Sequence, residues 1–184
     1  MLSRDDAFTL LATHVPDPAL RAHCLESEAV LRALAMRLGQ DAELWGITGL
    51  LHDLDYATTK DAPARHGLDS AELLAGLLSE DALAAIRAHN AEHTGFAPAT
   101  PLDFALRCGE TVTGLIHTNA LVRPARMEGM DAKSLKKKMK DKAFAASVNR
   151  ETIGECQKLG LEQAEFFTLA IAAVAGVAKD VGLA

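Results

Sequence analysis

Apolar residues recur every three or four positions along most of the chain, which is the spacing of one buried helix face. This pattern predicts a short amphipathic helix over residues 3–14. It also predicts a longer helix that begins at Pro18, with Asp17 as its N-cap, and runs to Leu38. Gly39 follows as a typical stop signal, so the first third of the chain is expected to be helical.

The same spacing continues to the end of the chain, interrupted by segments rich in Gly, Pro, Asp and Thr. The clearest loops are residues 55–67 and 94–100, and Pro124 and Gly129 mark a further break. Asp41 is expected to cap a helix that carries Trp45 and ends at the tract "GLLHD". The later helices are predicted at 69–78, 79–93, 101–121, 134–139, 146–159 and 161–177.

Composition supports an all-α fold. The chain has 184 residues, 49% of them hydrophobic and only 4% aromatic, and Ala and Leu dominate while β-branched runs are scarce. We therefore expect a helical bundle of about eight to ten helices with one core. The apolar segment "FFTLAIAAVAGVA" near the end is expected either to complete this core or to form a dimer face. The oligomeric state is left open between monomer and homodimer.

Charge and cysteine usage restrict the location and the partners. No apolar run reaches membrane-spanning length, no signal-like segment opens the chain, and the three cysteines form no CxxC pair. These features favour a cytoplasmic protein with reduced thiols and no membrane partner. The net charge is −6, yet residues 133–150 hold seven basic residues and one acidic residue. This basic tract indicates either a phosphate-bearing ligand or a solvated helix face.

Three polar residues stand on predicted helices where side chains can converge. His23 lies among apolar neighbours, and His52 and Asp53 lie where a helix ends. Adjacent residues on a helix point about 100° apart, so the doublet does not form a pair of its own. Imidazole nitrogen and carboxylate oxygen are suitable ligands for divalent transition metals. A histidine, a His-Asp doublet and a later acid would complete such a site.

The order "H…HD…D" resembles the HD superfamily of metal-dependent phosphohydrolases. His23 matches its first histidine, and His52 with Asp53 matches its doublet, preceded by "GLLHD" and followed by "LDY". The tract "ALRCGETVTGLIHTNALVRP" is similar to a subgroup of small HDIG-type hydrolases. Alignment on "TGLI" puts Glu110 where that subgroup carries aspartate, which is a departure that moves the carboxylate by more than an ångström. Asp103 is the nearest alternative acid, two turns earlier.

The resemblance implies a set of site residues. The metal ligands are His23, His52, Asp53 and Glu110, and the ion is Mn, Ni, Fe, Co, Zn or Mg. Asp53 or a neighbouring acid is expected to orient water, and His66 or His89 to protonate the leaving oxygen. His66, His89 and His93 are candidates for a second metal or for substrate. His93 matches no family position but lies four residues after His89, on the same predicted helix face. His14 and His117 are expected to be structural, although His117 follows Glu110 by two turns.

The subgroup also has a basic C-terminal segment like "KKKMKDKAFAASVNRETI". By this resemblance, candidates for binding substrate phosphate are Arg123, Lys137, Lys140 and Arg150. The expected organisation is an HD domain with the metal site over residues 1–125. Residues 126–184 form a helical extension that carries the basic segment and packs on the same core.

The leading hypothesis is a metal-dependent phosphohydrolase that cleaves a phosphate ester of a nucleotide or a similar small metabolite. One alternative is a nucleotide-binding or signalling HD module that has lost activity through Glu110. Another is a di-iron HD-fold oxygenase, which requires His66 and His89 to bind a second iron. The chain has no GxxxxGK[ST] phosphate loop and no alternation of aromatic and basic residues, and its acidic total argues against nucleic acid as a partner.

Overall fold

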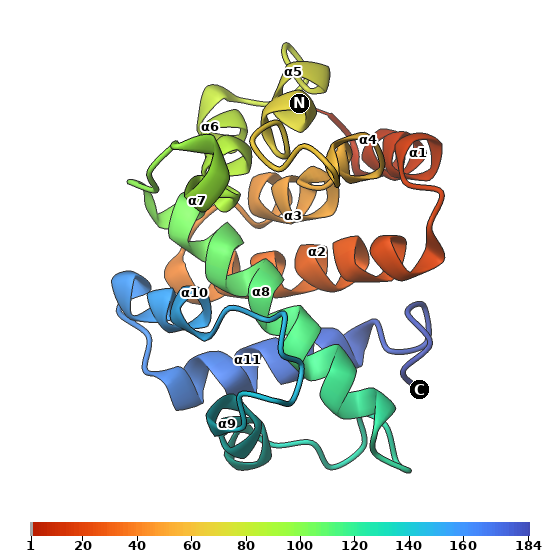
Figure 1. Ribbon diagram of the computed structural model, residues 1–184, viewed down its shortest axis with the longest axis vertical. Coiled ribbons are helices and arrows are strands. Elements are labelled where there is room, and N and C mark those ends of the chain that lie inside the picture. Colours follow the sequence, from red (N-terminus) through yellow and green to blue (C-terminus); the bar gives the residue numbers. More distant parts are fainter. Residues whose placement is uncertain (1) are drawn as a thin grey trace.

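A computed structural model describes residues 2–184 and shows a fold made of helices, without a strand among these residues (Figure 1). The all-α prediction is confirmed. The α-helices are α1 Arg4–His14, α2 Pro18–Leu38, α3 Ala42–Leu51, α4 Tyr56–Thr59, α5 Leu68–Leu73, α6 Glu80–His89, α7 Ala91–Thr94, α8 Pro101–Leu121, α9 Ala132–Lys140, α10 Arg150–Gly154 and α11 Gln163–Gly176. A 3₁₀ helix, η1, covers Glu155–Leu159.

Helix α2 lies at the centre and begins and ends where the sequence predicts. The side chain of Asp17 accepts a hydrogen bond from the backbone N–H of Ala19 at 2.9 Å, and Pro18 takes the first helical position. Gly39 ends the helix in the left-handed conformation, with φ of 66°. Helix α2 packs against α3 on one side and α8 on another, so residues on its inner faces reach both neighbours.

The second long helix, α8, crosses α2 and separates α6 from the C-terminal helices (Figure 1). Thr100 and Asp103 form a reciprocal capping box at its start, and Pro101 opens the helix. The Asp103 carboxylate accepts from the backbone N–H groups of Ala99 and Thr100, at 2.8 and 2.9 Å. This capping role holds Asp103 at the helix start.

Three predicted helices are shorter or interrupted. The helix expected over 69–78 starts at Leu68 and ends at Leu73. The helix expected to reach residue 93 stops at His89, because Asn90 leaves the helical conformation before the single turn α7. The segment expected over 146–159 becomes α10 and η1, after Asn149 caps α10 with its side chain. Residues before Asn149 therefore form a loop.

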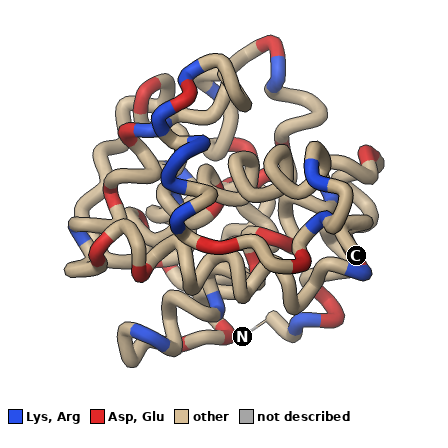
Figure 2. Tube along the Cα trace, turned by 90° about the horizontal axis from the view of Figure 1, so that it is seen from below, with Lys and Arg blue, Asp and Glu red and all other residues tan. Residues whose placement is uncertain are grey.

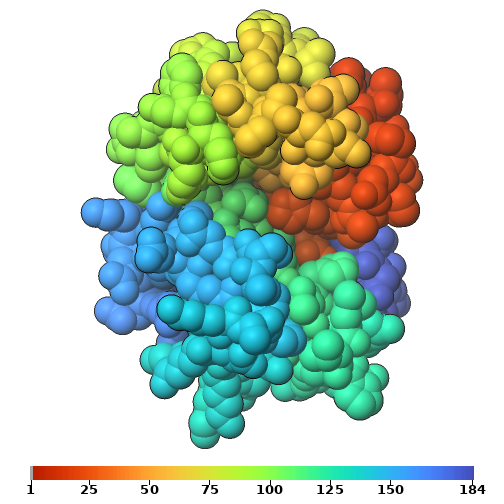
Figure 3. Space-filling view, viewed as in Figure 1, coloured from red at the N-terminus to blue at the C-terminus, as the bar shows by residue number. Residues whose placement is uncertain are grey.

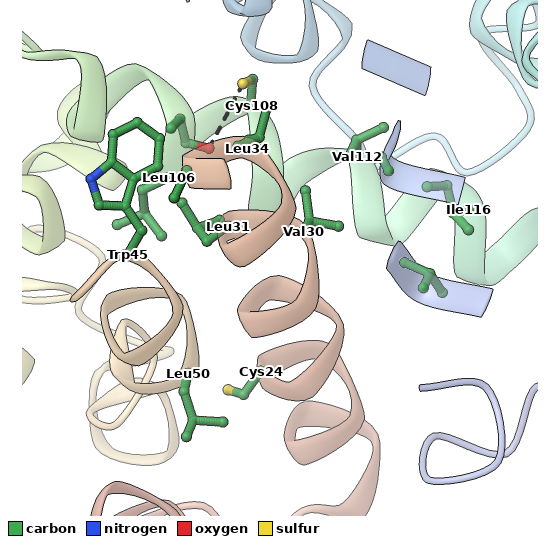
Figure 4. Packing of buried hydrophobic residues seen from close by; sticks show 14 of the residues in the cluster. Cys24, Val30, Leu31, Leu34, Trp45, Leu50, Leu106, Cys108, Val112 and Ile116 are labelled. Carbon is green, nitrogen blue, oxygen red and sulfur yellow. Dashed lines mark hydrogen bonds between the residues drawn. The ribbon is translucent and has the colours of Figure 1, made fainter. Parts of the chain in front are cut away.

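One continuous apolar core joins α2, α3 and α8 (Figure 4). Leu31 and Leu34 of α2, Leu50 of α3 and Leu106 of α8 are fully buried. The core continues into the C-terminal helices through residues such as Phe166 on α11. The last apolar helix therefore packs largely inward, against α2 and α8.

Basic residues are concentrated on α9. Five lysines lie on α9, and Figure 2 shows a helical stretch of basic residues as well as further basic and acidic positions spread over the trace. Over residues 2–184, no single helix is both long and apolar enough to cross a membrane. The segments Arg150–Leu159 and Gln163–Gly176 meet the criteria of length and composition only as a pair bent by 103°.

Glycine is required at position 49, where α3 meets α2. A Cβ atom built there would lie 2.9 Å from the backbone oxygen of Ser27, which cannot rotate away. We expect Gly49→Ala to reduce the free energy of unfolding by about 1–3 kcal/mol through overpacking, measured by urea denaturation. Gly154→Ala is the matched control, since Gly154 is helical with nothing within 4 Å. It should leave stability unchanged or raise it by up to about 1 kcal/mol. Equal effects of the two substitutions would contradict this account of the α2–α3 contact.

Candidate metal centre

The carboxylate of Asp53 lies among four imidazoles. Its Oδ1 is 3.3 Å from Nε2 of His52, 3.3 Å from Nε2 of His66 and 3.5 Å from Nε2 of His89. Its Oδ2 is 3.7 Å from Nε2 of His23. The predicted doublet thus forms the middle of a cluster to which each histidine presents the same ring nitrogen.

Four separate parts of the fold bring these side chains together. His23 projects from the second turn of α2, and His52 caps the C-terminus of α3 directly before Asp53. His66 comes from the loop before α5, and His89 is the last residue of α6. The chain leaves the helix after α3, which lets the adjacent side chains of His52 and Asp53 point to one centre. Helix packing, rather than local sequence, therefore builds the cluster.

The outer nitrogen of each ring is held by a fixed partner. Nδ1 of His52 lies 2.8 Å from the carbonyl oxygen of Gly49, and Nδ1 of His89 lies 2.6 Å from that of Ile86. A carbonyl oxygen only accepts, so both rings carry their proton on Nδ1. Their Nε2 atoms therefore offer a bare lone pair to the centre when the rings are neutral.

The other two histidines are held in the same tautomer. Nδ1 of His66 donates to the carboxylate of Asp55 at 2.8 Å. Nδ1 of His23 lies 2.9 Å from the hydroxyl oxygen of Thr113. That hydroxyl donates its own hydrogen bond to the carbonyl oxygen of Glu110. The Thr113 oxygen is therefore the acceptor, and His23 also turns a bare Nε2 inward.

This arrangement brings lone pairs of neutral rings face to face. Nε2 of His23 lies 3.3 Å from Nε2 of His52, and Nε2 of His66 lies 3.1 Å from Nε2 of His89. Two acceptors at this distance need a cation between or beside them. Histidine ligands in metal sites are typically anchored through the far nitrogen in this manner. The residues therefore fit a bound divalent metal ion.

Two groups of ligand atoms lie close enough together to bind a metal ion, and both groups include Asp53. The first comprises His23, His52 and Asp53, and the second comprises Asp53, His66 and His89. Within each group the ligand atoms all lie within 4.8 Å of one another. A carboxylate has two oxygens, so Asp53 can serve both groups as a bridge. Each group would supply ligands for a divalent ion, and Asp53 would be shared if both groups were filled.

Burial and charge keep His52 neutral and Asp53 ionised, and they act in the opposite direction on His89. Burial lowers the pKa of His52 to about 3, so this ring is neutral despite the attraction of Asp53. Burial opposes ionisation of Asp53, but the nearby histidines, His52 foremost, keep the pKa of its carboxyl well below its usual range. Burial also opposes protonation of His89, yet its hydrogen bond and charge interaction with Asp53 raise the pKa of that ring.

Asp55 contacts the cluster through His66 and is not among the residues predicted from the sequence. One of its oxygens accepts from His66, and the other accepts from the backbone N–H groups of Gly67 and Ser70, at 2.7 and 2.9 Å. Burial disfavours its ionised form, but these hydrogen bonds, that of His66 first, lower the pKa of Asp55. The acid in "LDY", two residues after the doublet, was the available signal.

Glu110 stands at the edge of the cluster. Its Oε2 is 3.7 Å from Nε2 of His23, while its Oε1 accepts from the hydroxyl of Thr111 at 2.5 Å. Burial raises the pKa of Glu110. Neither of the two ligand groups includes it, so its assignment as the fourth metal ligand stays a prediction. The alternative acid, Asp103, caps the start of α8 instead.

The cluster opens into a pocket of about 280 Å³. His23, His89 and Glu110 line it together with residues 147–149 and Thr152, whereas His52, Asp53 and His66 do not. Figure 3 shows a hollow where the green residues of α8 lie recessed between the yellow-green segments above and the blue C-terminal segment below. The extension beyond residue 126 therefore contributes one side of the pocket.

The predicted phosphate-binding cations lie elsewhere among the described residues. None of the four lines the pocket. Lys137 and Lys140 are exposed on α9, and Arg123 donates to the carbonyl oxygens of Arg126 and Glu128. The guanidinium of Arg150 donates to backbone carbonyl oxygens of the preceding loop, those of Asp141, Phe144, Ala145 and Val148. This contact gives Arg150 a role in holding that loop.

The remaining histidines lie outside the cluster. His93 is exposed, and its Nδ1 lies 2.8 Å from the side-chain oxygen of Asn90. The expected shared helix face with His89 is lost because α6 ends before Asn90. His117 lines a neighbouring cavity of about 200 Å³ beside His23 and pairs with buried Glu26 at 2.6 Å, which raises the pKa of this ring. His14 lines a separate cavity.

A sequence profile described as the HD domain matches residues 20–142, about two thirds of the chain. The chain belongs to the HD-domain family. No curated protein and no solved structure matches it. Membership places this HD protein in a superfamily of metal-dependent hydrolases that bind divalent metal ions, and the cluster around Asp53 supplies groups able to hold them.

Metal content tests the two-ion arrangement. We expect the HD protein, purified without chelator, to hold two divalent ions per chain by elemental mass spectrometry. His66→Ala should retain one ion, because it removes a ligand of the second group only, and Asp53→Asn should lose the bridge and both ions. His93→Ala is the matched control and should retain two. One ion in both the wild type and His66→Ala would refute the arrangement.

Proposed function

We propose that this HD protein is a metal-dependent phosphohydrolase that cleaves small phosphate monoesters. The observation that carries the proposal is the placement of Asp53 within 3.7 Å of the Nε2 atoms of four histidines, two of which, His23 and His89, line a pocket. A pair of ions sharing one carboxylate is a frequent arrangement for the attack of water on phosphorus.

The reaction is a displacement at phosphorus. Water attacks the phosphoryl group, the ester P–O bond breaks, and inorganic phosphate and an alcohol are released. The proton lost by water ends on the alcohol oxygen. Divalent ions at such a centre supply Lewis-acid chemistry: they lower the pKa of water and offset charge on phosphoryl oxygens.

The residues of the chain position the reactants. The anchored tautomers of His23, His52, His66 and His89 direct four ligand atoms inward without rearrangement. We assign His66 and His89 to metal binding rather than to protonation of the leaving oxygen. The Nε2 atoms that would carry that proton face the carboxylate of Asp53. Asp53 bridges the two ligand groups and orients water beside them.

Two other functions share parts of this geometry. A di-iron oxygenase would use the same two ligand groups, and it would be distinguished by two irons per chain and by oxygen consumption with a substrate. A non-catalytic binding module would follow if the displacement of Glu110 from the ligand groups abolished activity. It would bind phosphorylated compounds without releasing phosphate.

Phosphate release tests the proposed function. The protein is incubated with a panel of sugar, polyol and nucleoside monophosphates and nucleoside triphosphates, with Mn, Ni, Co or Mg added singly. We expect metal-dependent release of phosphate from at least one monoester, abolished by chelator. Asp53→Asn should reduce kcat/KM at least about 100-fold because it removes the shared ligand.

The matched control is His93→Ala, which changes a histidine outside the cluster and should retain wild-type activity. Absence of turnover on the whole panel, with wild type and Asp53→Asn indistinguishable, would reject the phosphohydrolase assignment. Oxygen uptake with two bound irons would favour the oxygenase instead.

A further inference from the structure

The C-terminal extension contributes a neutral wall to the pocket, made of Ser147, Val148, Asn149 and Thr152. Ser147, Asn149 and Thr152 supply two hydroxyls and one amide, and Thr111 and Gly114 of α8 also line the pocket. All three polar residues belong to the C-terminal extension, beyond the residues matched by the HD profile. This part of the pocket therefore lies outside the matched HD domain.

We propose that the alcohol part of the substrate is a small, neutral, hydroxyl-rich group, a sugar or polyol carrying a single phosphate. The proposal rests on the phosphohydrolase function above and names its substrate class. It distinguishes sugar and polyol monophosphates from nucleotides, for which the pocket lacks the expected contacts.

Charge disfavours a second or third phosphate. Among residues 2–184, no lysine or arginine lines the pocket, whereas Glu92 and Glu110 do. Glu92 pairs with Arg107 at 2.7 Å, but the same guanidinium also pairs with Glu155 at 2.7 Å. These three groups together carry one net negative charge beside the pocket. Additional phosphate groups would meet repulsion there instead of the cations that usually bind them.

Shape and surface disfavour a nucleobase. The pocket volume of about 280 Å³ lies just below the range of about 300–1,000 Å³ typical of small-molecule sites. Its lining within the described chain contains no Phe, Tyr or Trp, so a base would find no aromatic ring except those of the ligand histidines. The adjoining cavity beside His23 adds Glu26 and His117, again without Lys, Arg or a large aromatic residue.

The polar groups of the wall are free to bind hydroxyls. The side-chain oxygen of Asn149 caps α10 by accepting from Glu151 and Thr152, which leaves its NH₂ group as an unused donor. The hydroxyls of Ser147 and Thr152 form no hydrogen bond with any residue from 2 to 184. Hydroxyl and amide groups both donate and accept, which matches the hydroxyls of a polyol.

The wall is held in place before substrate binds. Arg150 donates to four backbone carbonyl oxygens of the loop that carries Ser147 and Val148. On the other side, buried Arg107 joins Glu155 of η1 to the carbonyl oxygens of Ala88 and His89. Arg107 therefore connects η1, which follows the wall in the chain, to the end of α6, where His89 lies. Such preorganisation favours specific recognition of a small ligand.

Competing substrates test the proposal. The metal-loaded full-length protein is assayed with glycerol 3-phosphate, glucose 6-phosphate, ethyl phosphate, AMP and ATP. We expect the highest kcat/KM for a sugar or polyol monophosphate, with AMP and ATP at least tenfold lower. Higher kcat/KM for AMP or ATP would overturn this assignment while leaving the phosphohydrolase function standing. No turnover on any ester would overturn both.

Wall variants provide the second readout. Ser147→Ala and Thr152→Val each remove one hydroxyl. For each variant kcat/KM is measured with the preferred polyol phosphate and with ethyl phosphate, and we expect the ratio of the first to the second to fall about three- to tenfold. Thr168→Val on α11 is the matched control, because its exposed hydroxyl lies outside the pocket and bonds to Ala164. A ratio that stays at the wild-type value in both wall variants would contradict recognition by this wall.

Discussion

Four imidazoles direct the same ring nitrogen at one carboxylate, that of Asp53, and the fold around them serves to keep them there. Each Nδ1 is held by an acceptor, two of them backbone carbonyl oxygens at helix ends, so each neutral ring has a bare Nε2 toward the centre. Lone pairs at 3.1 and 3.3 Å repel unless a cation joins them. The helical scaffold thus holds a set of ligands whose electrostatic balance requires positive charge.

This constraint explains features that lie several residues from the ligands. Because Gly49 has no side chain, α3 can approach the backbone of α2 at Ser27 closely, and His52 at the end of α3 lies beside His23 of α2. Asp55 binds His66 with one oxygen and the start of α5 with the other, which fixes a loop residue as firmly as a helical one. Arg107 performs a similar role between His89 and the C-terminal wall of the pocket. Metal ligands and pocket wall are therefore supported by the same buried polar contacts.

Local patterns predicted the fold well where capping signals were strong, as at Asp17, Gly39 and Pro101. They failed where tertiary contacts interrupt a helix, as at Asn90, which separates His93 from His89. Order along the chain and the family resemblance pointed to His23, His52, Asp53, His66 and His89. Neither indicated the anchoring of each Nδ1 or the contacts of Arg150, since both depend on how distant segments pack. The lysine tract suggested phosphate binding, but the position of a pocket relative to a surface helix is not encoded in local charge.

The shared carboxylate is tested most directly by anomalous X-ray diffraction from crystals of the Mn-loaded protein. The account predicts two anomalous peaks per chain on either side of Asp53, one next to Nε2 of His23 and His52 and the other next to Nε2 of His66 and His89. A single peak bound by one group alone, or peaks that do not contact Asp53, would contradict it.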